Sequence, residues 1–210
     1  MSHSLDSEAM TLAERKQAEK RRAIAEAALK VFARDGFSAA KMDDVALEAG
    51  VAKGTLYLYH ASKEELFEAT VREKLLPVLD AASDIRAEYT GPAADLMRAQ
   101  VRFFYTHVVG TDLAQIMRMI IAEGPRFPRL AEFYQREVIS RGETLIVSTL
   151  EYGVARGEFQ PFTGEQVGKV LMGPAVMIAL WTMVFGEGDR NDLDAFFETH
   201  MSFMLRALKA

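Results

Sequence analysis

The sequence has no cysteine among its 210 residues, so it forms no disulfide framework and no thiolate metal site. The histidines are far apart, at His3, His60, His107 and His200, and have no metal-ligand spacing. The sequence also lacks a glycine-rich phosphate loop, a nucleophile elbow and a paired-carboxylate motif. These absences disfavour the rival interpretation, an enzyme, and predict that the protein uses no metal and no cofactor.

Targeting and membrane-spanning segments are also missing. Residues Met1–Met10 lack the basic-then-apolar pattern of a signal peptide, so we expect a cytoplasmic protein. The uncharged run Val170–Gly186 falls slightly short of the roughly 20 residues that a transmembrane helix needs, contains Gly173-Pro174 and has no flanking basic cluster. We therefore expect no contact with a membrane.

The net charge of −5 argues mildly against a nucleic-acid partner. The cations are nevertheless clustered near the N-terminus, at Arg15, Lys16, Lys20, Arg21 and Arg22. Charges act over about 8 Å at physiological salt, so acidic residues farther along the chain weaken DNA binding little. The cluster is either a solvated helix start or a set of phosphate contacts.

Residues Met42–Leu66 are typical of a short helix, a tight turn, a second short helix and the capped start of a third. Gly50 can adopt the positive φ that ends one helix and lets the next leave at a steep angle. Apolar residues on both sides of the turn, such as Val45 and Leu56, can pack the two helices together. The second helix then exposes a small, cationic, hydroxyl-bearing face that suits a phosphate-lined groove: Lys53, Gly54, Thr55, Tyr57 and Tyr59.

This segment resembles the helix-turn-helix of TetR-family transcriptional regulators. The matching stretches are Val45-Ala46, Ala49-Gly50-Val51, Gly54-Thr55-Leu56-Tyr57, Tyr59 and Ser62-Lys63-Glu64-Glu65-Leu66, and the upstream segment Ala23–Phe37 also fits. Two positions differ from the family pattern, because Lys41 stands where a capping hydroxyl residue is usual and His60 where an aromatic residue is common. Lys41 cannot cap the helix as Ser or Thr does.

The resemblance implies an all-α protein that binds double-stranded DNA. Its parts are expected to be a disordered or partly helical tail over residues 1–18, a three-helix helix-turn-helix DNA-binding domain over 19–66, and a helical ligand-binding and dimerisation domain over 67–210. Lys53 is expected to reach a base edge, and either tyrosine of the second helix is alternatively a core residue. The expected DNA-binding residues are Lys41, Ala52, Lys53, Gly54, Thr55, Tyr57, Tyr59, His60 and Lys63.

The uncharged run Val170–Gly186 is expected to form a helix that is apolar on every side. Such a helix must be buried on every side, and in a chain of this size that favours a second subunit. In TetR-like proteins the last two long helices form a four-helix bundle across a twofold axis. The resemblance therefore implies a homodimer that binds a palindromic operator. The expected interface residues are Val170, Met177, Ile178, Trp181, Phe185, Phe196, Met201 and Met204.

Methionine and aromatic residues of the C-terminal region can form an adaptable apolar cavity. Residues Ile121–Leu130 are similar to the ligand domains of an AefR-like subgroup, a resemblance that names no ligand. The apolar side chains and the TetR-family resemblance together imply a mostly apolar small-molecule effector that releases DNA. Plain core packing and a DNA-binding dimer without small-molecule control remain the alternatives. The expected pocket residues are Phe104, Tyr105, His107, Met117, Glu123, Met177 and Trp181.

Overall fold

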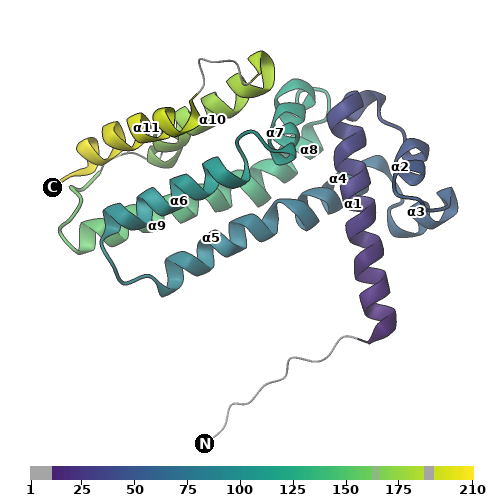
Figure 1. Ribbon diagram of the computed structural model, residues 1–210, viewed down its shortest axis with the longest axis horizontal. Coiled ribbons are helices and arrows are strands. Elements are labelled where there is room, and N and C mark those ends of the chain that lie inside the picture. The colour runs from purple at the N-terminus through teal and green to yellow at the C-terminus, as the bar shows by residue number, and fades with distance from the viewer. Residues whose placement is uncertain (1–10, 163, 165, 187–191) are drawn as a thin grey trace, which may run out of the picture.

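The computed structural model describes residues 11–162, 164, 166–186 and 192–210. Helices make up the regular structure of these residues, which form no β-strand, so the predicted all-α fold is confirmed (Figure 1). The elements are α1 Leu12–Ala39, α2 Met42–Glu48, α3 Lys53–Tyr59, α4 Lys63–Lys74, α5 Leu76–Glu88, α6 Ala93–His107, α7 Asp112–Glu123, α8 Pro128–Tyr134, the π-helical turn η1 Gln135–Ile139, α9 Ser140–Ala155, α10 Val167–Phe185 and α11 Leu193–Leu208.

Helix α1 begins earlier than the sequence indicated. Thr11 caps it in a capping box, because its hydroxyl accepts a hydrogen bond from the Glu14 amide while the Glu14 carboxylate accepts one from the Thr11 amide. Residues 12–18 of the predicted tail are therefore helical. The helix kinks at Gly36, whose φ is 75°, and the chain then turns toward α2.

Helices α1 to α4 form an N-terminal head around a small aromatic core. The rings of Phe32, Phe37 and Phe67 lie 5.7 to 6.0 Å apart and are fully or almost fully buried. Val45 and Leu56 are buried against this cluster, as their place in the motif predicted. Burial on one side leaves the opposite sides of α2 and α3 facing solvent.

Helices α5 to α11 form the C-terminal bundle, where α6 and α9 lie side by side with α5 along one flank and α10 and α11 along another (Figure 1). Asp192 caps α11 by accepting hydrogen bonds from the amides of Asp194 and Ala195. Helix α4 ends at Lys74 and α5 begins after Leu75 with Pro77 in its first turn, a position that tolerates proline.

The head and the bundle meet where α7 packs against α1. The Glu123 carboxylate on α7 accepts a hydrogen bond of 2.7 Å from the Ser38 amide, and the Phe37 and Phe127 rings meet edge to face at 4.8 Å. Arg118 adds a hydrogen bond of 2.9 Å to the carbonyl of Ala33. Helix α4 provides a second link, because it crosses the predicted boundary after residue 66 and packs on α1.

Candidate nucleic-acid interface and effector region

The turn between α2 and α3 has the predicted geometry. Gly50 adopts φ 64°, and the Val51 amide donates to the Ala46 carbonyl at 3.0 Å. Helix α3 then starts at Lys53 with Ala52 as an N-cap that makes no side-chain bond. The first amides of α3 are therefore left for a partner outside the motif.

One face of α3 is open to solvent. Ala52, Lys53 and Gly54 are exposed, and 43% of the Tyr57 surface is accessible. No side chain lies within 4 Å of a Cβ built at Gly54, so another molecule can approach the backbone there. Thr55 and Tyr59 are half-buried, and Tyr59 packs against the head's core.

Lys53 is held by a neighbour that the sequence reading overlooked. Its ammonium donates a hydrogen bond of 2.9 Å to the Asp43 carboxylate at the start of α2. This hydrogen bond and the charge of Asp43 raise the pKa of Lys53. Both side chains are more than half exposed, so the pair contributes little to stability. Another acceptor can therefore replace Asp43 as the partner of Lys53.

Lys63 and His60 have partners within the head. The Lys63 ammonium donates to the carbonyls of Ser38 and Ala40 at 2.9 Å each and lies 4.8 Å from the centre of the Phe37 ring. These contacts leave at most one ammonium hydrogen for a phosphate. Burial lowers the pKa of His60, so its imidazole is neutral near pH 7 and adds no positive charge.

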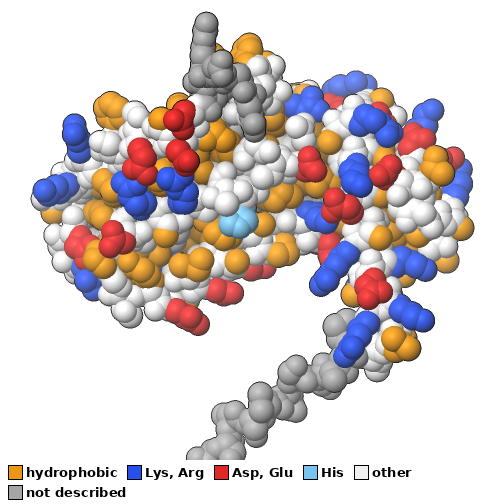
Figure 2. Space-filling view, in the orientation of Figure 1, with side chains coloured by type: hydrophobic (Ala, Val, Ile, Leu, Met, Phe, Trp, Pro, Cys, Tyr) orange, Lys and Arg blue, Asp and Glu red, His pale blue; other side chains and the backbone are white. Residues whose placement is uncertain are grey.

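Further cations surround this face. Lys41 is exposed at the start of α2 and makes no capping bond, as its residue type predicts. The basic run of residues 15–22 is exposed along the protruding N-terminal half of α1, where Figure 2 shows several Lys and Arg side chains. Two exposed leucines were missed by the sequence reading, Leu47 on α2 and Leu58 on α3, with 83% and 88% of their surfaces accessible.

The predicted effector residues do not surround a common cavity. Met177 and Trp181 are 58% and 48% exposed on the outside of α10, and His107 is exposed with its ring stacked on Phe103. Glu123 belongs to the joint with α1. Each of these four side chains faces solvent or the head in this structure, so their place in an effector pocket stays a prediction.

The remaining predicted pocket residues are Phe104, Tyr105 and Met117. Tyr105 and Met117 are buried, and Phe104 is partly buried against the same core. The Tyr105 hydroxyl pairs with Nδ1 of buried His200 at 3.2 Å, and burial raises the pKa of Tyr105 to about 12. None of the three lines the groove or the second cavity described below, which favours their alternative interpretation as core.

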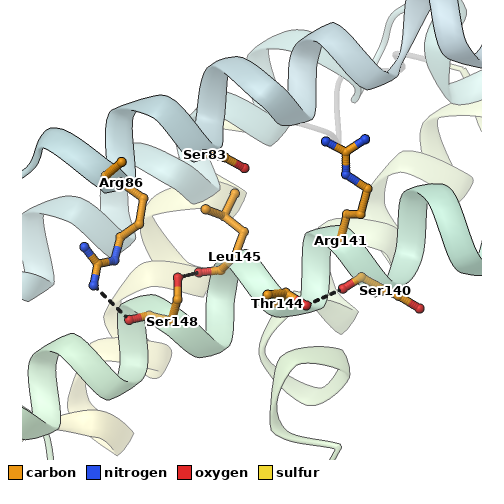
Figure 3. A pocket seen from close by; sticks show the side chains of 8 residues that line it. Ser83, Arg86, Ser140, Arg141, Thr144, Leu145 and Ser148 are labelled. Carbon is orange, nitrogen blue, oxygen red and sulfur yellow. Dashed lines mark hydrogen bonds between the residues drawn. The ribbon is translucent and has the colours of Figure 1, made fainter.

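A groove between α5 and α9 has a volume of about 520 Å³ (Figure 3). The second cavity, of similar volume, lies where α1 meets α7 and the end of α10. The groove's lining residues are Ser83, Arg86, Ala87, Ser140, Arg141, Thr144, Leu145 and Ser148. These residues were not predicted, because an apolar pocket lined by methionine and aromatic side chains was expected.

The predicted dimer residues divide between the interior and the surface. Met201, Met204 and Ile178 are only 0 to 4% exposed, so they pack in the protomer's own core. Phe196 is half-buried. Several large apolar side chains are nevertheless exposed on α10 and α11, and two of them, Val184 and Phe203, were not predicted. This pairing face consists of Val170, Met177, Trp181, Val184, Phe185 and Phe203, which are 48 to 74% exposed.

Helix α10, Val167–Phe185, has 19 residues and is long and apolar enough to cross a bilayer, by length and composition alone. The same helix packs against α6, α7, α9 and α11, and Ala175, Ile178 and Ala179 on its inner side are buried. A bundle helix with one uncovered apolar side accounts for this composition.

The fold and the open face of α3 define a helix-turn-helix DNA-binding protein with a helical C-terminal domain. Residues 24–70 match the family described as "Bacterial regulatory proteins, tetR family". Residues 95–207, more than half of the chain, match "AefR-like transcriptional repressor, C-terminal domain". The chain therefore belongs to the TetR family of transcriptional regulators, which are not enzymes.

Similar proteins agree with this assignment. The HTH-type transcriptional regulator YhgD of Bacillus subtilis (strain 168) is 29% identical over 161 residues, 73% of this chain and 79% of that protein. A TetR-family structure from Mesorhizobium loti MAFF303099 has a TM-score of 0.76 at 23% identity, covering 93% of this chain and 99% of that one. FadR of Bacillus subtilis, in complex with stearoyl-CoA, has a TM-score of 0.71 at 19% identity, covering 89% and 98%.

Proposed function

We propose that this chain is a cytoplasmic transcriptional repressor that binds a palindromic operator as a homodimer. A small-molecule effector bound to the C-terminal domain releases it from DNA. Helix α3 enters the major groove, where Lys53 contacts a base edge and Ala52 and Gly54 let the backbone approach. The residues that hold phosphates are Lys41, Thr55, Tyr57, Tyr59, His60 and Lys63.

The observation that carries this proposal is the open face of α3. It combines Lys53, whose ion pair is exposed, with the exposed Tyr57 and with Gly54, which has open space around it among the described residues. Helix α3 itself has no carboxylate. Such a face offers donors to phosphate and base edges but no group for catalysis. His60 and Lys63 are its weakest members, because one is neutral and the other is already bonded to two carbonyls.

Dimerisation is supported by the pairing face on α10 and α11. Uncovered apolar residues recur along α10 at Val170, Met177, Trp181 and Val184, with Phe203 on α11. The spacing of the four α10 residues places them along one side of the helix, and exposed apolar residues gathered in this way are typical of a protein interface. A single recognition helix discriminates too few base pairs for a genome-scale search, so two copies held one DNA turn apart are needed.

Control by a ligand is supported by the groove between α5 and α9 and by the stearoyl-CoA complex of the similar FadR structure. Helix α5 continues from α4, which packs on α1 of the head. A ligand that moves α5 can therefore change the angle of the head. The groove is lined by apolar surface together with arginine and hydroxyl groups, so it suits an effector that has both an apolar and a polar part.

Selection of bound duplexes from a random DNA library tests the proposal. We expect enrichment of an inverted repeat whose half-sites lie about one helical turn apart. No enrichment, or a single half-site without its mirror copy, would contradict it. Light scattering of the free protein, measured in parallel, separates a failure of pairing from a failure of recognition.

A further inference from the structure

The groove between α5 and α9 has donors at its two ends and acceptors along its length. Arg86 and Arg141 flank it, with Leu145 between them (Figure 3). The hydroxyls of Ser148 and Thr144 donate to backbone carbonyls of α9 at 2.8 and 2.9 Å. Their protons are thereby engaged, so the guanidinium groups are the strong donors that a ligand meets.

Arg86 is held in place but incompletely bonded. Its guanidinium lies 4.6 Å from the centre of the Tyr152 ring and donates to the Ser148 carbonyl at 3.2 Å. Its Nε is buried and has no hydrogen-bond acceptor among the described residues. A buried charged donor without an acceptor is costly, which indicates that a ligand or water supplies one.

Arg141 lies two helical turns before Ser148 on α9. Its guanidinium pairs with Asp80 of α5, and both side chains are substantially exposed, so an incoming anion can replace this partner. Helix α9 begins here directly after the π-helical turn Gln135–Ile139, and Ser140 Oγ donates to the Gln135 carbonyl at 2.9 Å. Such wide turns are frequent at functional sites.

We propose that this groove binds an anionic small molecule. Its carboxylate or phosphate contacts Arg86 or Arg141, which can offer bidentate donors, and its uncharged part lies over Leu145 and Ala87. No carboxylate is among the described side chains that line the groove. The claim that this anion is the effector rests on the proposed function, whereas the claim that it binds here does not.

Isothermal titration of the full-length protein with octyl phosphate, octanoate and octanol tests the site. The three probes share a chain length, so the first two compare phosphate with carboxylate and the third removes the charge. We expect at least one anion to bind at least about tenfold more tightly than octanol, since charge-assisted hydrogen bonds are the strong ones. Equal binding of octanol would overturn the proposal.

Two variants and a matched control locate the binding. At least one of Arg141→Gln and Arg86→Gln should weaken the anion about tenfold, whereas Arg129→Gln should not, because Arg129 is exposed on α8 outside the groove. Arg86→Gln also loses its contact with Tyr152, so Arg141→Gln, which breaks an exposed ion pair with Asp80, serves as the variant that must fold. Anion binding unchanged by Arg141→Gln and by a folded Arg86→Gln would overturn the proposal.

The role as effector is measured separately with the selected duplex. We expect the tighter anion to lower DNA affinity in the parent and less so in Arg141→Gln. An anion that binds in the groove without changing DNA affinity would overturn the effector claim. A protein that selects no DNA would overturn the proposed function, while the titration, which needs no DNA, would still judge the groove.

Discussion

The two open helix faces of this protein differ in chemistry. The face of α3 presents Lys53, Gly54 and Tyr57, whereas that of α10 presents side chains such as Met177 and Trp181. The first leaves donors for a charged, hydrated partner, and the second leaves apolar surface that water solvates poorly. The contrast supports the proposal that α3 meets nucleic acid and that α10 meets a second copy of the chain.

The largest expected effect comes from placing a charge on the apolar face. Trp181→Glu would bury a carboxylate in the proposed interface, so we expect the dimer dissociation constant to rise by about 100-fold or more. Light scattering after size-exclusion chromatography measures it. Ile85→Glu is the control, since Ile85 is 45% exposed on α5 outside the pairing face. A dimer that survives Trp181→Glu unchanged would remove α10 from the interface.

The second largest effect is expected at the joint between the N-terminal head and the C-terminal bundle. Glu123→Ala removes the acceptor for the Ser38 amide, a charge-assisted hydrogen bond, so we expect the free energy of unfolding to fall by about 1 to 3 kcal/mol. Urea denaturation measures this loss. Glu132→Ala, at an exposed position of α8, should change stability little. Equal losses in both variants would mean that the hydrogen bond to Ser38 does not stabilise the joint.

A third prediction concerns DNA affinity at the exposed face of α3, which Asp43→Asn should change. It removes a negative charge and weakens the hold on Lys53, so we expect a few-fold tighter binding to all duplexes and a steeper dependence on salt. Fluorescence anisotropy over a salt series measures both. The comparison variant is Asp84→Asn on the exposed surface of α5. Weaker binding by Asp43→Asn would instead assign Asp43 a positioning role for Lys53.

The smallest expected effect is on pH dependence in the bundle. Burial lowers the pKa of His200, and its neutral ring bonds both Tyr105 and the Leu171 carbonyl. The unfolded chain binds this proton near pH 6.5, so stability is fully present above that pH and falls as the pH drops below it, by less than about 1.4 kcal/mol for each unit of pKa shift.

Denaturation between pH 7.5 and 5 measures that loss. His200→Gln should flatten the pH dependence of the free energy of unfolding, because it removes this imidazole. Burial also lowers the pKa of His60, which contributes in the same direction and remains in the variant. An unaltered slope in His200→Gln would show that His200 does not titrate on unfolding.

The sequence predicted the head better than the bundle for a physical reason. In Met42–Leu66 the turn glycine, the cap at Ser62 and the apolar spacing each fix a local conformation, so the path of the chain could be predicted. Contacts made by distant residues could not. The pairing of Lys53 with Asp43 and of Lys63 with the end of α1 depends on how the helices pack.

Helix α10 shows why the bundle was harder. Nearly all of its residues are apolar, so the pattern does not distinguish Ile178, which is buried, from Met177, which is exposed. The groove between α5 and α9 could not be predicted, because arginine and serine on amphipathic helices have the sequence pattern of ordinary solvent-facing residues. Only the approach of α5 to α9 brings Arg86 and Arg141 to one site.

The most direct test of the central claim, that α3 of each copy reads DNA through Lys53, is a random-library selection with Lys53→Ala beside the parent. We predict that the variant loses preference at one base pair in each half-site, related by the same twofold axis, and binds the parent's best duplex about 1 to 3 kcal/mol more weakly. An identical selected sequence from the parent and the variant would contradict the account.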